Sequence, residues 1–152
     1  MALPEARELA IVLITIGPRL EEQVPRYSKG DDVTRAAILD DIGSTAADMA
    51  VADVRRRLAK QVTSRGYELS SPVSPGMPGF PLTEQRHLLQ LAGAAKIGVA
   101  VTASGVFVPR KLISMVMGVG SHMTRWTQAE VCAHCGLRNT CRYKASAWDE
   151  SG

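Results

Sequence analysis

The first hydrophobic segment of the chain predicts a buried strand. Residues 10–16 read AIVLITI, a run rich in β-branched side chains that ends at Gly17 and Pro18. A run of this kind followed by a turn is typical of a strand in a protein core. Residues 18–26 are mostly compatible with a helix, and Pro25 limits or kinks that helix.

A longer helical pattern follows. It begins at Asp31 or Asp32, either of which can cap a helix, and continues to about Arg65, just before Gly66. Gly43 lies inside the pattern, where a glycine indicates a close approach to the backbone. Packing against a neighbouring element is the leading explanation, and a kink or a bound ligand is the alternative. We expect one apolar stripe of this helix to face the core; its members are Ile38, Ile42, Ala46 and Met49.

Residues 69–82 contain four of the eight prolines of the chain, together with several serines and glycines. This composition predicts a rigid loop without regular structure. Loops of this length are uncommon in compact domains and are often functional, because their backbone groups are free to bind a ligand. A plain structural connector is the alternative.

The rest of the chain predicts one more helix and a set of strands. Thr83 is expected to cap the helix, which ends near Gly93 or Gly98. Three extended segments follow, the first two joined as a hairpin by residues 103–105: residues 99–102, 106–108 and 112–119. This order of elements predicts an α+β fold with a mostly antiparallel sheet.

Composition and charge exclude several classes of function. The 152 residues carry a net charge of +3 and only 5% aromatic side chains, which argues against nucleic-acid binding. No glycine-rich nucleotide-binding motif is present. The longest apolar run, residues 9–14, is too short for a membrane span and wrongly flanked for a signal peptide. We therefore expect a cytoplasmic protein with reduced thiols and no membrane association.

Six short motifs follow one another between residues 10 and 120: Thr15-Ile16-Gly17-Pro18, Ile38-Leu39-Asp40-Asp41-Ile42-Gly43-Ser44, Ser74-Pro75-Gly76, Pro81-Leu82-Thr83-Glu84-Gln85, Ile97-Gly98-Val99 and Val108-Pro109-Arg110-Lys111. Together they resemble the activation domain of cobalamin-dependent methionine synthase. That domain binds S-adenosylmethionine over the cobalamin, so that an oxidised, inactive cobalt is reduced and remethylated. The resemblance implies a twisted, mostly antiparallel sheet packed with helices.

By the same resemblance, the chain would serve a corrinoid-carrying protein or methyltransferase, with cobalamin present only through that partner. The family's ligand loop usually carries an arginine four residues before a Gly-Tyr pair, whereas this chain has Pro72 and then Gly76-Met77. Proline cannot supply the charge-assisted bonds that an arginine gives to a ligand carboxylate. The candidate ligand-binding residues that remain are Ser74, Pro75, Gly76 and Glu84.

All three cysteines fall within ten residues, as Cys132-x2-Cys135-x5-Cys141. Two thiolates separated by two residues, as in Cys132 and Cys135, can bind one metal ion from a tight turn. An iron–sulfur cluster is the leading prediction, and zinc with His122 as a fourth ligand is the alternative. His134 lies between two ligand cysteines and is the poorer candidate. A thiol–disulfide switch and inert thiols remain open.

The leading functional prediction is an accessory protein for reductive activation or methylation of a corrinoid protein. Reactivation of a corrinoid requires one-electron reduction, which an iron–sulfur centre can deliver and zinc cannot. A protein that supplies the electron to the cluster is then a possible second partner. The alternatives are a methyl-transfer enzyme that binds S-adenosylmethionine and a zinc-stabilised interaction module, so enzymatic activity stays open. We expect residues 1–120 to resemble the activation domain and residues 121–152 to form a metal-binding tail.

Overall fold

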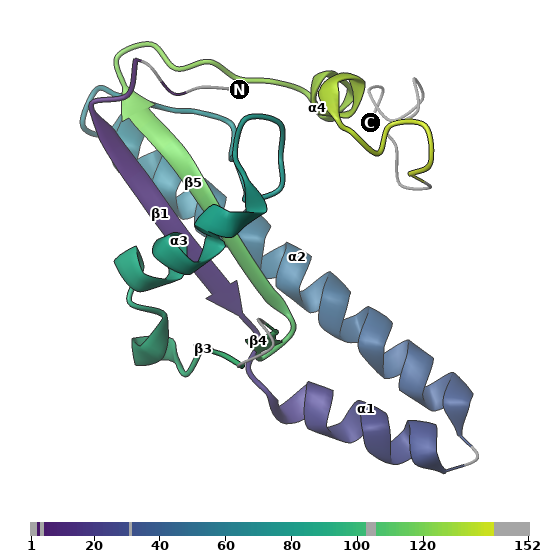
Figure 1. Cartoon of the computed structure of the whole chain (residues 1–152). Helices are drawn as coiled ribbons and strands as arrows, with labels where there is room; N and C mark the ends of the chain where they lie inside the picture. Colours follow the sequence, from purple (N-terminus) through teal and green to yellow (C-terminus); the bar gives the residue numbers. More distant parts are fainter. Residues whose placement is uncertain (1–2, 4, 31, 103–105, 142–152) are drawn as a thin grey trace.

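The structure is a computed structural model that describes residues 3, 5–30, 32–102 and 106–141. The predicted cap at Asp31, the turn 103–105 and the tail beyond Cys141 lie outside these residues. Figure 1 shows the helices and strands along the chain, whose bounds are β1 Glu8–Thr15, α1 Arg19–Lys29, α2 Val33–Thr63, β2 Glu68–Leu69, a 3-10 helix Leu82–Glu84, α3 Gln85–Leu91, a 3-10 helix Ala94–Ile97, β3 Ala100–Val101, β4 Phe107–Val108, β5 Leu112–Gly120 and α4 Gln128–His134.

Strand β5 is the centre of a three-stranded antiparallel sheet in the order β1-β5-β2. Its register with β1 runs from Glu8 opposite Val119 to Thr15 opposite Leu112. Strands β3 and β4 form a separate antiparallel hairpin. The α+β fold with an antiparallel sheet, expected from the order of elements, is therefore confirmed.

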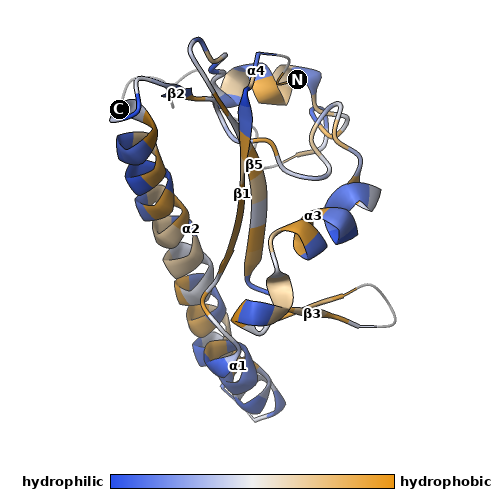
Figure 2. Cartoon of the chain, turned by 90° about the vertical axis from the view of Figure 1, so that its left-hand side faces the viewer, coloured by the Kyte–Doolittle hydropathy of each residue, from blue (hydrophilic) through white to orange (hydrophobic). Residues whose placement is uncertain are grey.

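The chain is arranged in three layers, with α2 on one face of the sheet and α3 with the proline-rich loop on the other (Figure 2). Side chains alternate between the two faces of a strand, so β5 contributes to both layers. Met115 and Met117 belong to the core cluster that includes α2, and Met117 is fully buried. Val116 belongs to the cluster on the α3 side.

Helix α2 begins where the sequence predicts. The Asp32 carboxylate accepts a hydrogen bond from the backbone N–H of Arg35 at 3.1 Å and so caps the helix. Gly43 is buried, and a Cβ atom placed on it would lie 2.9 Å from the Leu20 side chain of α1. The predicted close approach to this glycine is confirmed, and the approaching element is α1.

The apolar stripe predicted to face the core does not do so. The exposed fraction is 54% for Ile38, 52% for Ile42 and 69% for Met49, and Ala46 is half-buried. The core is instead contacted by a different face of α2, on which the fully buried residues are mostly small: Ala36, Gly43, Ala47 and Val62. Small side chains let α2 lie close to α1 and the sheet, so the bulkier residues are left on the outer face.

Two further differences concern the ends of helices. Thr83 does not cap α3, because a 3-10 turn over Leu82–Glu84 precedes the helix without a side-chain cap. Helix α4 was not predicted, since seven residues carry too little periodicity to reveal a helix; a capping box between Thr127 and Glu130 starts it. Among the helices of the described residues, none is long and apolar enough to cross a membrane.

Candidate functional site

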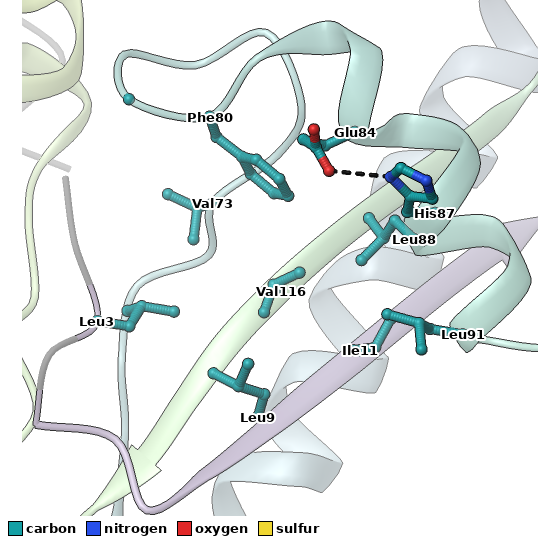
Figure 3. Close-up of a pocket in the computed structure, with 11 residues that line it drawn as sticks. Leu3, Leu9, Ile11, Val73, Phe80, Glu84, His87, Leu88, Leu91 and Val116 are labelled. Atoms are coloured by element: carbon teal, nitrogen blue, oxygen red, sulfur yellow. Dashed lines mark hydrogen bonds and ion pairs between the residues drawn. The ribbon is translucent and has the colours of Figure 1, made fainter.

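An open pocket of about 390 Å³ lies on the face of the sheet opposite α2, among the residues of the core cluster on the α3 side. Strands β1 and β5 form its floor, the end of the proline-rich loop forms one wall and α3 forms another. Figure 3 shows its apolar side chains directed toward one another across the hollow. The residues that line it are Leu3, Leu9, Ile11, Val73, Gly79, Phe80, Glu84, His87, Leu88, Leu91 and Val116.

The proline-rich loop is held in place by its own backbone and by the sheet. Val73 exchanges two backbone hydrogen bonds with Val116 of β5, at 2.9 and 2.8 Å. Farther along, the backbone N–H of Gly76 donates to the carbonyl of Phe80 at 2.8 Å, and Gly76 takes a φ of +95°. That φ favours glycine strongly. The two attachments fix Phe80 at the edge of the pocket.

Glu84 and His87 are the polar side chains among the described residues that line the pocket. The Nδ1 atom of His87 lies 3.1 Å from Oε2 of Glu84, and both side chains are substantially exposed (Figure 3). They lie three residues apart, a spacing that brings side chains together on a helix. The pair presents a carboxylate and an imidazole beside an otherwise apolar surface, which suits a ligand with both apolar and hydrogen-bonding parts.

The structure brings only part of the predicted ligand site together. Glu84 lines the pocket, whereas Ser74, Pro75 and Gly76 lie earlier in the loop and are not among the lining residues. Their role in the structure is to turn the loop, since the N–H of Met77 donates to the carbonyl of Ser74 at 3.0 Å. His87 was not predicted as a site residue. Its spacing of three residues from Glu84 could have indicated that the two side chains contact each other on a helix.

The three cysteines are partly or fully exposed and make no disulfide with one another. Cys132 lies in α4, Cys135 follows the last residue of that helix, and Cys141 follows a further turn. The Cys135 sulfur accepts a hydrogen bond from the backbone N–H of Leu137 at 3.4 Å. Cysteine sulfur binds metal as the thiolate, so each of the three thiols would give up its proton on binding.

The proposed metal ligands have side chains of the right chemistry. His122 lies in an exposed bend just after β5, six residues before α4 begins. The ring of His134 turns back along α4, because its Nδ1 donates to the carbonyl of Glu130 at 2.9 Å. Among the described residues, no three side chains of the metal-binding types gather around one point. Metal binding by the three thiols would require the segment after α4 to fold around the ion.

A second hollow, of about 370 Å³, is basic. Arg55 and Arg56 of α2 and Arg125 of the segment before α4 line it, and no carboxylate is among its described lining residues. These guanidinium groups are exposed and give this surface a positive potential.

The comparisons with known proteins do not assign a family. No protein-family model matches the chain, and a search of curated proteins finds no significant match.

Proposed function

We propose that this protein is a cytoplasmic accessory protein for the reductive activation or methylation of a corrinoid held by a partner protein. The observation that carries the proposal is the open apolar pocket with the Glu84–His87 pair on its wall, next to the loop where the sequence resembles the methionine synthase activation domain. A corrinoid is a large macrocycle with apolar faces and amide-bearing arms. The pocket offers an apolar surface beside hydrogen-bonding groups. These would match the apolar ring and the amide arms at one edge of the corrinoid.

The size of the pocket supports a partner-held corrinoid. At about 390 Å³, it lies toward the lower end of the range for small-molecule sites and cannot enclose a whole macrocycle. In this proposal Phe80 and Leu88 contact the apolar edge of the corrinoid. Glu84 accepts hydrogen bonds from its amide arms, and His87 holds the Glu84 carboxylate in position.

Three thiols in the C-terminal segment support a redox role. Cys132, Cys135 and Cys141 are the proposed ligands of an iron–sulfur cluster, which supplies one electron at a time when bound. His122 is the proposed fourth ligand if the metal is zinc. The cysteines are spread over a short turn-rich segment, and metal sites commonly fold only when the metal binds.

The test of the metal is analysis of iron, zinc and acid-labile sulfide in protein purified without oxygen, with an absorption spectrum. Iron with sulfide and a brown colour is the expected result. Zinc in colourless protein would support the interaction module instead, and no metal would contradict both. Cys135→Ala should lose most of the metal, whereas Asn139→Ala, an exposed neighbour in the same turn, should keep it.

The test of the pocket is binding to a corrinoid protein, measured by surface plasmon resonance with the partner loaded and unloaded. Phe80→Ala and His87→Ala should weaken binding to the loaded partner by about tenfold, as expected when a contact near the centre of an interface is removed. Ile97→Ser, an exposed change outside the pocket, is the control. Equal affinity of all variants would contradict the proposed site.

A methyl-transfer enzyme that binds S-adenosylmethionine is the second candidate, and one observation favours it. Glu84 places a carboxylate beside the Phe80 ring in the pocket, and both groups attract a cation such as a sulfonium. Stoichiometric transfer of a labelled methyl group from S-adenosylmethionine to the partner's cobalt would favour this candidate over the accessory role.

A further inference from the structure

The outer face of α2 carries an apolar stripe that nothing in the described residues covers. We call Ile38, Ile42, Thr45 and Met49 the outer α2 stripe; Ile38, Ile42 and Met49 are each more than half exposed. The four residues line one shallow groove together with Asp41 and Ala46. Figure 2 shows α2 as an outermost layer, with the sheet on its other side. Apolar residues grouped on an exposed face mark an interaction surface more often than scattered ones do.

The spacing of the stripe suits a second helix. Its members follow one another at intervals of four, three and four residues, which is the interval of the apolar seam in a coiled coil. Helices joined by such a seam cross at a shallow angle of about 20° and stay close over several turns. The occupant of the groove is therefore a helix that lies along α2.

We infer that this helix is α2 of a second copy of the same chain, packed antiparallel through the outer α2 stripe. The stripe is symmetric about a level between Gly43 and Ser44: Ile42 and Thr45 lie equally far from that level, and so do Ile38 and Met49. A two-fold axis at this level places Ile38 of one copy near Met49 of the other, and the reverse. A symmetric dimer interface requires this kind of self-complementary surface.

Charge complementarity fixes the direction of the pairing. Arg35 lies nine residues before Ser44 and Asp53 nine residues after it. Nine residues are about two and a half helical turns, so both side chains project from the face opposite Ser44. Ser44 itself faces the body of the molecule, where its hydroxyl accepts a hydrogen bond from Nζ of Lys111 at 2.8 Å. In the antiparallel dimer, Arg35 of each copy lies close to the level of Asp53 of the other.

The contacts that these two residues make within one chain leave them able to pair between chains. Arg35 is 3.7 Å from Asp32, and its guanidinium carbon lies 5.1 Å from the centre of the Tyr27 ring of α1. Asp53 is 2.7 Å from the Nε atom of Arg57 and 4.0 Å from Arg56. The exposed fractions of these five charged side chains range from 46% to 76%. Exposed pairs within a helix contribute little, so exchanging them for contacts between copies costs little.

The first experiment measures the mass of the full chain in solution by analytical ultracentrifugation, with a reductant present so that thiols cannot link two copies. A monomer has a mass of 16.3 kDa, and a concentration-dependent species of twice that mass is expected. Ile42→Asp should raise the dissociation constant at least about tenfold, because it places a charge in the seam. Ile97→Asp, at an exposed apolar position outside α2, is the matched control.

The second experiment tests the register with a charge exchange. Arg35→Glu and Asp53→Arg should each weaken the dimer, since each puts like charges at one level, and the double variant should restore it. Within one chain the two positions are eighteen residues apart, about 27 Å along the helix, so only contact between copies explains a rescue. Circular dichroism confirms that each variant is folded.

The outcomes decide the inference. A monomer at all concentrations overturns it, as does a dimer that Ile42→Asp leaves unchanged. A double charge variant as weak as the single variants overturns the antiparallel pairing. Loss of the dimer in Ile42→Asp but not in Ile97→Asp supports the outer α2 stripe as the interface. Rescue by the double charge variant supports the antiparallel pairing. Because the stripe lies on the opposite side of the sheet from the pocket, these results do not depend on the corrinoid proposal.

Discussion

Replacement of Gly120 by alanine tests how the end of β5 is packed. A Cβ atom at this position would lie 2.8 Å from the backbone carbonyl oxygen of Glu5 and 2.8 Å from the sulfur of Met123. Ordinary contacts of a methyl group with such atoms are longer. The Met123 side chain can move away, but the backbone near Glu5 is fixed by the hydrogen bond from Arg7 N–H to the carbonyl of Val119, at 2.9 Å.

The magnitude follows from two opposing effects. Inserting a methyl group into tight packing costs about 1–3 kcal/mol. Alanine recovers part of this, up to about 1 kcal/mol, because glycine loses more backbone freedom on folding. Subtracting the second effect from the first leaves a net loss of unfolding free energy of about 0–2.5 kcal/mol. The middle of the two ranges gives about 1 kcal/mol, which lowers Tm by about 2–4 °C in a chain of this size.

The assay is thermal and urea unfolding of wild type and variant, followed by circular dichroism. Gly30→Ala is the matched control, because a Cβ atom at Gly30 meets nothing closer than 3.7 Å and its φ of −88° suits any residue. The reasoning is refuted if Gly120→Ala destabilises the protein no more than Gly30→Ala does.

Three further predictions concern the core, the surface charge and the ligand loop. Met117→Ala should lower the free energy of unfolding by about 2–5 kcal/mol in a urea titration, because Met117 is fully buried; a smaller loss would contradict tight packing there. The Arg65 guanidinium hydrogen-bonds the Glu8 carboxylate and lowers its pKa below the ordinary 4.5. The contribution of this pair to stability is therefore complete above about pH 4.5 and is lost as the pH falls through the folded-state pKa. An NMR titration should show this depressed pKa, and Arg65→Ala should raise the pKa of Glu8 toward its ordinary value, while the nearby charge of Arg7 still lowers it. Finally, Pro72→Arg with Met77→Tyr should strengthen binding of S-adenosylmethionine in calorimetry, and no gain would contradict the alignment of this loop with the methionine synthase family.

Much of the fold could be predicted because local signals and burial agree. The β-branched run of β1 and the apolar run of β5 both become strands, and Asp32 caps α2 as its side chain allows. Strand β5 is buried as expected, whereas β1 lies at the edge of the sheet and most of its residues are half-buried. The wrong prediction was the buried face of α2. Large apolar residues suggest a core face, but small residues were selected there because α1 packs against Gly43. A single sequence does not show which of two stripes on a helix meets a neighbour.

The candidate site was predicted only in part for a different reason. Glu84 was predicted through the resemblance to the methionine synthase activation domain, but the pocket depends on Ile11 of β1 and Val116 of β5. These residues come together only through strand pairing between distant parts of the chain. His87 joins the site through its contact with Glu84. The cysteine cluster could be recognised from spacing alone, whereas the conformation of its turn could not.

The pairing of β1 with β5 also determines the order in which the chain can fold during synthesis. Glu8 is paired with Val119, so more than a hundred residues must leave the ribosome before the first strand meets its partner. Helices α1 and α2 are neighbours in sequence and can pack much earlier. Until β5 emerges, the nascent chain presents the apolar β1 strand with its hydrogen-bonding edges open. Molecular chaperones that bind extended apolar segments can therefore bind the β1 segment while the rest of the chain is still being synthesised.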